Sequence, residues 1–341
     1  MAIRDGSSYM NGIFPKFELP PVVKGDLTGK TVMITGANSG IGFEAAKHFA
    51  TMNPARLIIV CRSVEKAQES IKQIEGETGY KNAEPMALDL GKFSSISEFA
   101  TRASKTLDRL DILVENAAVA LTEYVPSEDG WESMLQVNAV GPAMHVLLLL
   151  PIIINTAKQH SVVPRIVVVS SGLAYTCDIG SDAIATPNTL ETLSSKKYCT
   201  AEVLAKRYQQ TKILNVMLVR KLVELLPKTV VPVTLSPGFC LSGLRRNATG
   251  EIAVQFKKME ETFAYTSEEG SRHIIFSAIG GTDEELRGAF ISESWIPLEL
   301  PDWMLSQEGK KAEDKIWTEM LTLFGKLDDR IPGIVTEYLK V

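Results

Sequence analysis

Seven short runs of β-branched and other apolar residues, separated by longer helix-like segments, constrain the fold of this chain more than any other feature. The runs are Thr31–Thr35, Leu57–Val60, Met86–Leu90, Ile112–Val114, Arg165–Ser170, Val231–Leu235 and Ala289–Ser292. Near-continuous apolar character is typical of strands buried on both faces, as in parallel sheets. The segments between them, such as 64–77, 95–107 and 198–226, have apolar residues at helical spacing. The pattern predicts one α/β domain: a doubly wound, mainly parallel seven-stranded sheet flanked by helices, as in a Rossmann fold.

The length of 341 residues suits one large domain with terminal extensions. We expect an extended N-terminal arm over residues 1–25 and the α/β domain over residues 26–295. Residues 296–341 are expected to form a C-terminal extension with one helix, Glu313–Leu327.

Charge and composition exclude several kinds of partner. The formal net charge of −5 disfavours nucleic acid and anionic membrane surfaces, because both reward a basic face. The longest apolar run, Met144–Ile154, is shorter than the ~20 residues of a membrane-spanning helix, so it predicts a buried core helix. Cys61, Cys177, Cys199 and Cys240 have no CxxC spacing, which favours free thiols and a cytoplasmic protein. The four histidines have no metal-ligand spacing, so we expect no metal site.

A glycine-rich turn follows the first predicted strand and leads into a helix predicted over residues 41–52. Gly36, Gly40 and Gly42 permit a tight turn and let backbone N–H groups approach a pyrophosphate, which the helix N-terminus also attracts. The spacing differs from the usual G-x-G-x-x-G dinucleotide fingerprint, so the glycines alone leave an ordinary turn as an alternative. Their place between a buried strand and a helix favours a phosphate site.

The ordered motifs of residues 28–295 resemble those of the short-chain dehydrogenase/reductase family, classical type, and especially its retinol-dehydrogenase-like and fungal secondary-metabolism members. Residues 35–42, TGANSGIG, resemble the family's cofactor loop. The resemblance implies a cofactor site made of Gly36, Asn38, Ser39, Gly40, Ile41, Gly42, Asp89, Leu90, Asn116, Ala117, Ala118, Tyr208, Lys212, Pro237 and Gly238. It also implies that Asp89 contacts the adenine ring and that residues 239–266 form a lid over the substrate.

Tyr208 is the only one of eight tyrosines with a Lys or Arg four residues later. On a helix, Lys212 lies one turn from the phenol, and we expect its ammonium to lower the phenol pKa for general acid–base catalysis. The resemblance adds that Lys212 holds the nicotinamide ribose.

Two further residues complete the predicted catalytic set. Ser171 ends a buried strand and can donate to a substrate oxygen; the adjacent Ser170 is its rival. For Asn138, expected in mid-helix, the resemblance implies a water that links it to Lys212. The alternative for Asn138 is a core amide bonded to backbone.

Two features depart from the family pattern. Glu115 replaces the first Asn of the family's NNAG motif, so it either points away from the cofactor or changes the local hydrogen bonding. The segment between Ser171 and Tyr208 is longer than in compact members, and we expect this insert, residues 173–207, to rim the active-site mouth. The expected rim residues are Leu173, Tyr175, Ile179 and Ile184.

Arg62 follows the second predicted strand, where an NAD enzyme usually carries an acid for the ribose 2′-OH. Cys61 occupies the acid's place, and a guanidinium suits a 2′-phosphate. Arg62 therefore predicts NADP(H) rather than NAD(H); the alternative is an exposed arginine at a strand end. The pairs Arg245-Arg246 and Lys257-Lys258 are expected to be solvated.

These features predict an NADP(H)-dependent oxidoreductase that interconverts a secondary alcohol and a ketone, with Tyr208 as general acid/base. Phe239, Phe256, Met259 and Phe263 favour a bulky apolar substrate, terpenoid- or polyketide-like, unless they only anchor loops to the core. An enone reductase or epimerase on the same fold, or a non-catalytic NADP(H)-sensing protein, is the alternative. A homodimer is compatible with each of these functions.

Overall fold

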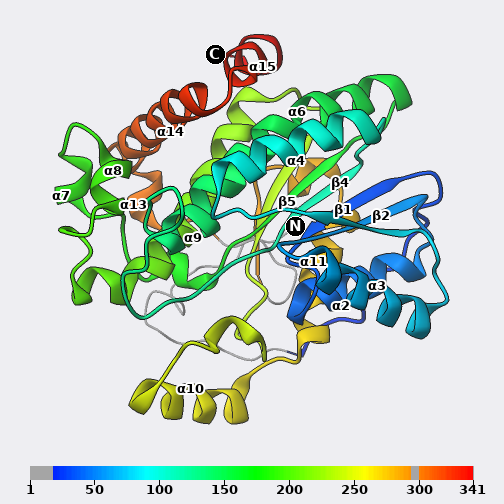
Figure 1. The fold of residues 1–341 in the computed structure, drawn as a ribbon, viewed down its shortest axis with the longest axis horizontal. Coiled ribbons are helices and arrows are strands. Elements are labelled where there is room, and N and C mark those ends of the chain that lie inside the picture. Colours follow the sequence, from blue (N-terminus) through cyan, green and yellow to red (C-terminus); the bar gives the residue numbers. More distant parts are fainter. Residues whose placement is uncertain (1–17, 293–298, 341) are drawn as a thin grey trace.

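The computed structural model describes residues 18–292 and 299–340, and within them seven parallel strands form one central sheet (Figure 1). The strands are β1 (Thr31–Thr35), β2 (Arg56–Cys61), β3 (Ala83–Ala87), β4 (Ile112–Glu115), β5 (Arg165–Val169), β6 (Val231–Leu235) and β7 (Phe290–Ile291). Their order in the sheet is β3-β2-β1-β4-β5-β6-β7. The predicted doubly wound α/β domain is confirmed.

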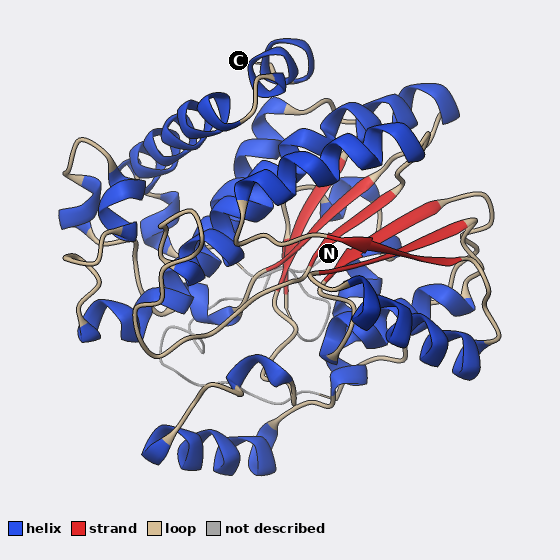
Figure 2. Cartoon of the chain, viewed as in Figure 1, coloured by secondary structure: helices blue, strands red, loops and turns tan. Residues whose placement is uncertain are grey.

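Helices cover both faces of the sheet (Figure 2). One face carries α4 (Phe93–Thr106), α6 (Gly141–His160) and α9 (Ala201–Leu225), and the other carries α2 (Gly40–Thr51), α3 (Val64–Thr78) and α11 (Ser267–Ile279). Successive strand residues point to opposite faces: Met33 packs on the α4–α6–α9 side, and Val32 and Ile34 pack on the other. Both faces are therefore apolar, which explains the continuous apolar runs.

The third strand was predicted at Met86–Leu90, but β3 comes earlier in the chain. It is an edge strand that pairs with β2 alone, and all its residues are half-buried. An edge strand needs no continuous apolar run, and it tolerates Pro85, which has no N–H to donate. Leu88 and Leu90 are buried just after the strand, and they produced the misleading pattern.

The apolar segment predicted as a core helix lies in one long helical run. This run, Ser133–His160, comprises α5 (Ser133–Leu135), the π-helix η1 (Gln136–Val140) and α6. It is long and apolar enough to cross a membrane by length and composition, but 83% of its most apolar window is buried inside the fold. That burial agrees with the core-helix prediction.

The C-terminal extension contains more structure than the one helix predicted. It forms α13 (Asp302–Leu305), α14 (Gln307–Leu327) and α15 (Arg330–Tyr338). Trp317, Phe324 and Ile331 join the buried cluster beneath α4, α6 and α9, so these helices complete the main core. The predicted boundary at 295/296 falls outside the described residues.

Only the end of the predicted N-terminal arm, residues 18–25, lies within the described residues. This stretch forms no helix or strand. Val22 and Val23 pack against the core cluster of α2 and α11.

The insert after β5 packs against the C-terminal extension, beside α13 and α14 in Figure 1. It forms the 3₁₀ turn η2 (Gly172–Tyr175), α7 (Ser181–Ile184) and α8 (Thr189–Ser194). Glu319 of α14 accepts hydrogen bonds from the backbone N–H groups of Thr189 and Leu190 at 2.9 and 2.8 Å. Lys315 donates to the carbonyls of Ile184, at 2.6 Å, and Thr186. Two side chains of α14 thus hold the ends of α7 and α8.

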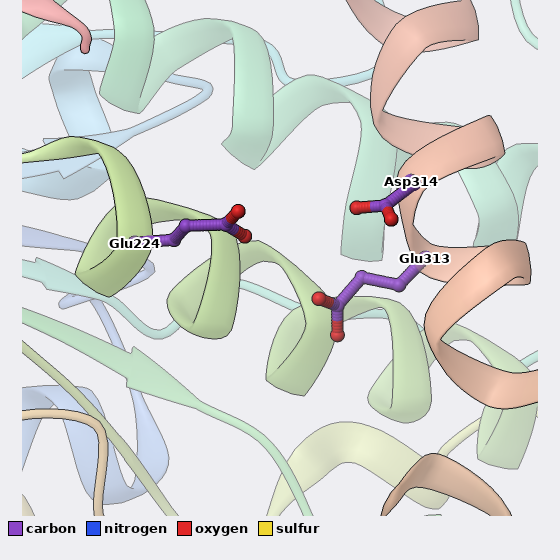
Figure 3. Close-up of side chains that lie close together, drawn as sticks. All are labelled: Glu224, Glu313 and Asp314. Atoms are coloured by element: carbon purple, nitrogen blue, oxygen red, sulfur yellow. The ribbon is translucent and has the colours of Figure 1, made fainter. Parts of the chain in front are cut away.

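Three carboxylates gather between α9 and α14, those of Glu224, Glu313 and Asp314 (Figure 3). Their oxygen atoms lie within 4.8 Å of one another. Lys221 pairs with Glu224 and Asp314 at 2.7 and 2.9 Å, and Lys310 contacts all three acids. The cluster is an ion-pair network that joins the extension to α9.

We predict that Glu319→Gln destabilises the protein. The substitution weakens two hydrogen bonds to buried backbone N–H groups at the start of α8, and loss of a helix N-cap typically costs ~1 kcal/mol. Thermal unfolding of the variant should shift to lower temperature, whereas Glu261→Gln, an exposed glutamate on α10 (Gly250–Phe263), should leave it unchanged. Equal unfolding temperatures for the two variants would contradict the role of Glu319.

Candidate active site

The carboxyl ends of the strands open into one cavity of about 500 Å³. It lies beside the junction of β1 and β4, where the strand order reverses direction, and doubly wound sheets bind ligands at this junction. All the residues predicted to hold the cofactor or carry out catalysis line it, except Gly42 and Asn138.

The glycine turn has little free space around its backbone. A Cβ at Gly36 would lie 2.9 Å from the Ala117 Cα, and one at Gly42 would lie 2.4 Å from the Asn116 Nδ2. Gly36 and Gly40 also have positive φ values of 68° and 60°, which favour glycine. Gly42 therefore acts by letting α2 approach the turn closely. The N-terminus of α2 then faces the cavity, a geometry that favours anions.

The predicted adenine end holds two cations. Arg62, in the bend between β2 and α3, and Lys66, in the first turn of α3, are both exposed and line the cavity. Sequence reasoning missed Lys66, although its place four residues after Arg62 was a usable signal. Cys61 donates its thiol proton to the Ser63 carbonyl at 3.0 Å. Asp89 accepts from the Gly91 N–H through one carboxylate oxygen, at 2.9 Å.

Tyr208 and Lys212 lie on the same face of α9. The Lys212 Nζ is 5.5 Å from the centre of the Tyr208 ring and donates to the Val169 carbonyl at 2.9 Å. The predicted pair is therefore brought together at the end of β5.

The two adjacent serines have different partners. Ser170 is buried and donates to the Lys212 carbonyl at 2.8 Å. Ser171 is half-buried and accepts from the Leu173 N–H at 3.2 Å, so its own proton can still be donated to a ligand. This difference favours Ser171 over Ser170 as the serine that faces a substrate.

The electrostatics of Tyr208 differ from our expectation. Burial raises the pKa of the phenol well above its usual value, although the Arg245 charge opposes the rise. Burial also lowers the pKa of Lys212 to about 7, because a low-dielectric site disfavours the ammonium. The predicted lowering of the Tyr208 pKa is therefore wrong for these side chains. Tyr208 is held in its protonated form, which suits a proton donor.

The Asn138 side chain forms hydrogen bonds with the protein backbone. Its side chain in η1 accepts from the Val119 N–H and donates to the Val119 carbonyl, both at 2.8 Å, and Nδ2 lies 3.3 Å from the Thr211 Oγ1. This is the core-amide alternative. Because Val119 lines the cavity, Asn138 positions a wall of the site.

The lid holds an arginine that we expected to be solvated. Arg245, in the 3₁₀ turn η3 (Gly243–Arg245), lies 4.1 Å from the Phe239 ring centre and pairs with Glu260 at 2.8 Å. It is half-buried and lines the cavity, as does the exposed Arg246. The expectation of a solvated side chain is wrong for Arg245, because Phe239 and Glu260 of the lid contact it, but Arg246 is exposed as expected.

The four lid residues expected to favour an apolar substrate, Phe239, Phe256, Met259 and Phe263, are only half-buried. Phe239 and Phe263 meet with ring centres 5.4 Å apart, but α10 contains no fully buried residue. In Figure 1 this helix stands apart from the sheet, at the lower edge. The apolar side chains of α10 therefore contribute little to the core.

The insert residues expected at the rim, Leu173, Tyr175, Ile179 and Ile184, do not line the cavity. Tyr175 and Ile179 are buried in the main core, and Tyr175 packs edge-on against Phe290, so the expected rim position is wrong for both. A separate apolar cluster lies at Tyr208 instead. It contains Met134, Cys199, Leu204, Val119, Leu121, Tyr124 and Tyr208. The spacing of Leu204, one helical turn before Tyr208, could have predicted its place in this cluster.

Comparison with known proteins identifies the family. A family model described as short chain dehydrogenase matches residues 30–179. The chain is 31% identical to the short-chain dehydrogenase anuD of Penicillium roqueforti (strain FM164), over 93% of this chain and 82% of that protein. The chain belongs to the short-chain dehydrogenase family. A second relative in this family, dmxR8 of Cryptosporiopsis sp. (strain 8999), is 30% identical over 94% and 98% of the two chains.

Solved structures share the fold of this short-chain dehydrogenase. NADPH-bound carbonyl reductase from chicken fatty liver matches with a TM-score of 0.59 and 18% identity, over 81% of this chain and 96% of that chain. The 3-ketoacyl-(acyl-carrier-protein) reductase from Brucella melitensis, complexed with NADH, matches with a TM-score of 0.57 and 20% identity, over 78% and 97%.

We predict that Lys212→Met stabilises the protein most at acidic and neutral pH. The native amine has a pKa of about 7, but the unfolded amine stays protonated to about pH 10.4. Between these values the unfolded chain binds more protons, so wild-type stability rises with pH. The advantage of the variant in unfolding temperature should be largest near about pH 6 and should shrink by about pH 9. The exposed Lys72→Met should give no such trend, and a pH-independent advantage for Lys212→Met would contradict the burial effect.

Proposed function

We propose that this short-chain dehydrogenase is an NADP(H)-dependent oxidoreductase that interconverts a secondary alcohol and a ketone on a bulky apolar substrate. The observation that carries the proposal is that Ser171, Tyr208 and Lys212 meet in the cavity that the glycine turn enters. The glycine turn, which suits a phosphate group, and Tyr208, which suits a proton donor, thus line the same cavity. A cytoplasmic location fits the four free cysteines.

The side chains divide the chemistry of ketone reduction among them. The cofactor, when bound, supplies the hydride. Tyr208 donates its phenolic proton to the carbonyl oxygen, and Ser171 donates a hydrogen bond to the same oxygen as negative charge develops there. Lys212, beside the ring, stabilises the phenolate that remains. In the oxidative direction these proton movements reverse.

The residues around the turn suit a dinucleotide. The N-terminus of α2 attracts the pyrophosphate, and the tight contacts at Gly36 and Gly42 admit no side chain. Asp89 accepts from the Gly91 N–H through one carboxylate oxygen, and its other oxygen can accept a hydrogen bond from the amino group of an adenine. Arg62 and Lys66 favour a 2′-phosphate, since neither is paired with an acid among the described residues.

The apolar cluster at Tyr208 supports a bulky apolar substrate. Cys199, Leu204 and Tyr124 pack with the cavity-lining Val119 and Tyr208 in this cluster, and the lid contributes the half-buried Phe239 and Phe263. Apolar walls with a few polar groups are typical of small-molecule sites. Terpenoid- or polyketide-like ketones of secondary metabolism fit this surface.

A series of ketones of increasing apolar bulk, assayed with NADPH, tests the proposal. We expect kcat/KM to rise with size, because each buried methylene contributes ~0.8 kcal/mol. Tyr208→Phe should lower kcat by about 10²–10⁴-fold and leave NADPH affinity nearly unchanged. A flat series, a preference for small hydroxylated carbonyls, or near-normal turnover by Tyr208→Phe would refute the assignment.

Cofactor choice is tested by Arg62→Ala. Loss of a charge-assisted phosphate contact of roughly 1.5–3 kcal/mol should weaken NADPH binding by about ten- to a hundredfold and leave NADH binding nearly unchanged. Lys66→Gln should have a smaller effect in the same direction, and Lys72→Gln, farther along α3, should have none. Equal losses for NADPH and NADH in fluorescence titrations would argue against a 2′-phosphate site.

A further inference from the structure

Glu115, the residue that departs from the family's motif, lies in a buried carboxylate–imidazole pair. It shares the face of β4 with Leu113 and points beneath α4 and α6, away from the cavity. There the His145 Nδ1 is 2.5 Å from the Glu115 Oε1, and the two side chains are 0% and 2% exposed. An ionised carboxylate only accepts hydrogen bonds, so Nδ1 is the donor.

Glu115 is the one polar partner of His145 among the described residues. The His145 Nε2 is buried with no hydrogen-bond partner in that part of the chain, and the ring packs edge-on against Phe99, with centres 4.8 Å apart. A buried charge of this kind is costly unless it is paired. The pair therefore has to remain together for either side chain to stay in place.

The second oxygen of Glu115 is linked to the loop after β4 by the Thr35 hydroxyl. The Thr35 hydroxyl donates to the Glu115 Oε2 at 3.2 Å, with the Val114 carbonyl at 3.3 Å as the competing acceptor. The same hydroxyl oxygen accepts from the N–H groups of Asn116 and Ala117, at 2.9 and 3.2 Å. Asn116 and Ala117 both line the cavity.

One hydroxyl has one proton and two lone pairs. When its proton goes to the carboxylate, a stronger acceptor than a carbonyl, both lone pairs of Thr35 are available to the two backbone N–H groups. His145 fixes the carboxylate, the carboxylate fixes the hydroxyl, and the hydroxyl fixes the loop after β4.

We propose that Glu115 and His145 are positioning residues for the dinucleotide, which act through Thr35 on the backbone at Asn116 and Ala117. The inference rests on the proposed function, since it assumes that this loop contacts a nicotinamide dinucleotide. The pair lies away from the 2′-phosphate site, so it affects NADPH and NADH alike, unlike Arg62.

Binding titrations with NADPH and NADH test the proposal. Glu115→Gln should weaken the binding of both cofactors by about five- to tenfold, the effect of one hydrogen bond. His145→Leu should do the same, whereas His145→Gln, which keeps a donor for the carboxylate, should stay within about twofold of wild type. Thr35→Val should weaken binding at least as much as Glu115→Gln, and Thr35→Ser, which keeps the hydroxyl, should restore it. Because the groups act in series, adding Glu115→Gln to Thr35→Val should cause no further loss.

A matched control separates positioning from stability. Thr156, on the same helix as His145, is fully buried and accepts from the Leu110 N–H at 2.9 Å, remote from the cavity lining. Thr156→Val should lower the unfolding temperature without changing cofactor affinity. If Glu115→Gln and His145→Leu behave like Thr156→Val, the proposal is overturned. Additive losses in the Thr35→Val/Glu115→Gln double variant would also overturn it.

Amide hydrogen exchange gives a readout that needs no cofactor. The N–H groups of Asn116 and Ala117 should be protected in the wild-type protein and should exchange at least about tenfold faster in His145→Leu and Thr35→Val. Unchanged exchange would refute the proposal even if Glu115→Gln fails to fold. If the wild-type protein binds neither NADPH nor NADH, the proposed function fails, and the exchange rates still decide whether the pair holds the loop.

Discussion

The reversal of strand order at β1 and β4 is the constraint on which the rest of the molecule depends. On either side of this junction the connecting helices pass to opposite faces of the sheet, so none of the described helices fills the space above the strand ends. Backbone turns rather than side chains close the space there. The glycine turn after β1 and the Asn116 loop after β4 meet so closely that a Cβ at Gly36 or Gly42 would collide with the neighbouring loop. The cavity and the position of the α2 N-terminus beside it both depend on the close contact between these two loops.

The sequence was most informative about buried strands and about the residues placed directly after them. Central strands are apolar on both faces, so their positions were readable, whereas β3 at the edge was misplaced because half-buried residues carry no such pattern. Tyr208 and Lys212 were predictable from their spacing, and Ser171 from its place at the end of a buried strand together with the family resemblance. The role of Asn138 was not, since its partner Val119 belongs to an irregular loop. The same limit applies to Arg245, whose contacts with Phe239 and Glu260 depend on how the lid folds back.

Electrostatics at the catalytic pair could not be predicted from spacing either. A lysine one turn from a tyrosine suggests a lowered phenol pKa, but the depth of the site decides the outcome. Desolvation acts on both groups and disfavours the charged form of each. The protein therefore presents a neutral phenol beside an amine that titrates near neutrality. Burial therefore keeps the proton on the phenol rather than on the neighbouring amine, which suits a group that donates a proton.

The contact between the insert and α14 has a consequence for how the chain is made. Glu319 caps α8 from 130 residues farther along the sequence, and α8 leads directly into the helix that carries Tyr208. Ribosomal synthesis delivers the N-terminal end of a chain first, so the glycine turn and its sheet can form while the last helices are still being translated. Asn188 caps α8 locally through the Glu191 N–H, but the hydrogen bonds from Thr189 and Leu190 to Glu319 form only when α14 has emerged. A nascent or truncated chain that lacks α14 can therefore possess the glycine turn and its sheet before the segment leading to Tyr208 is held in place by Glu319.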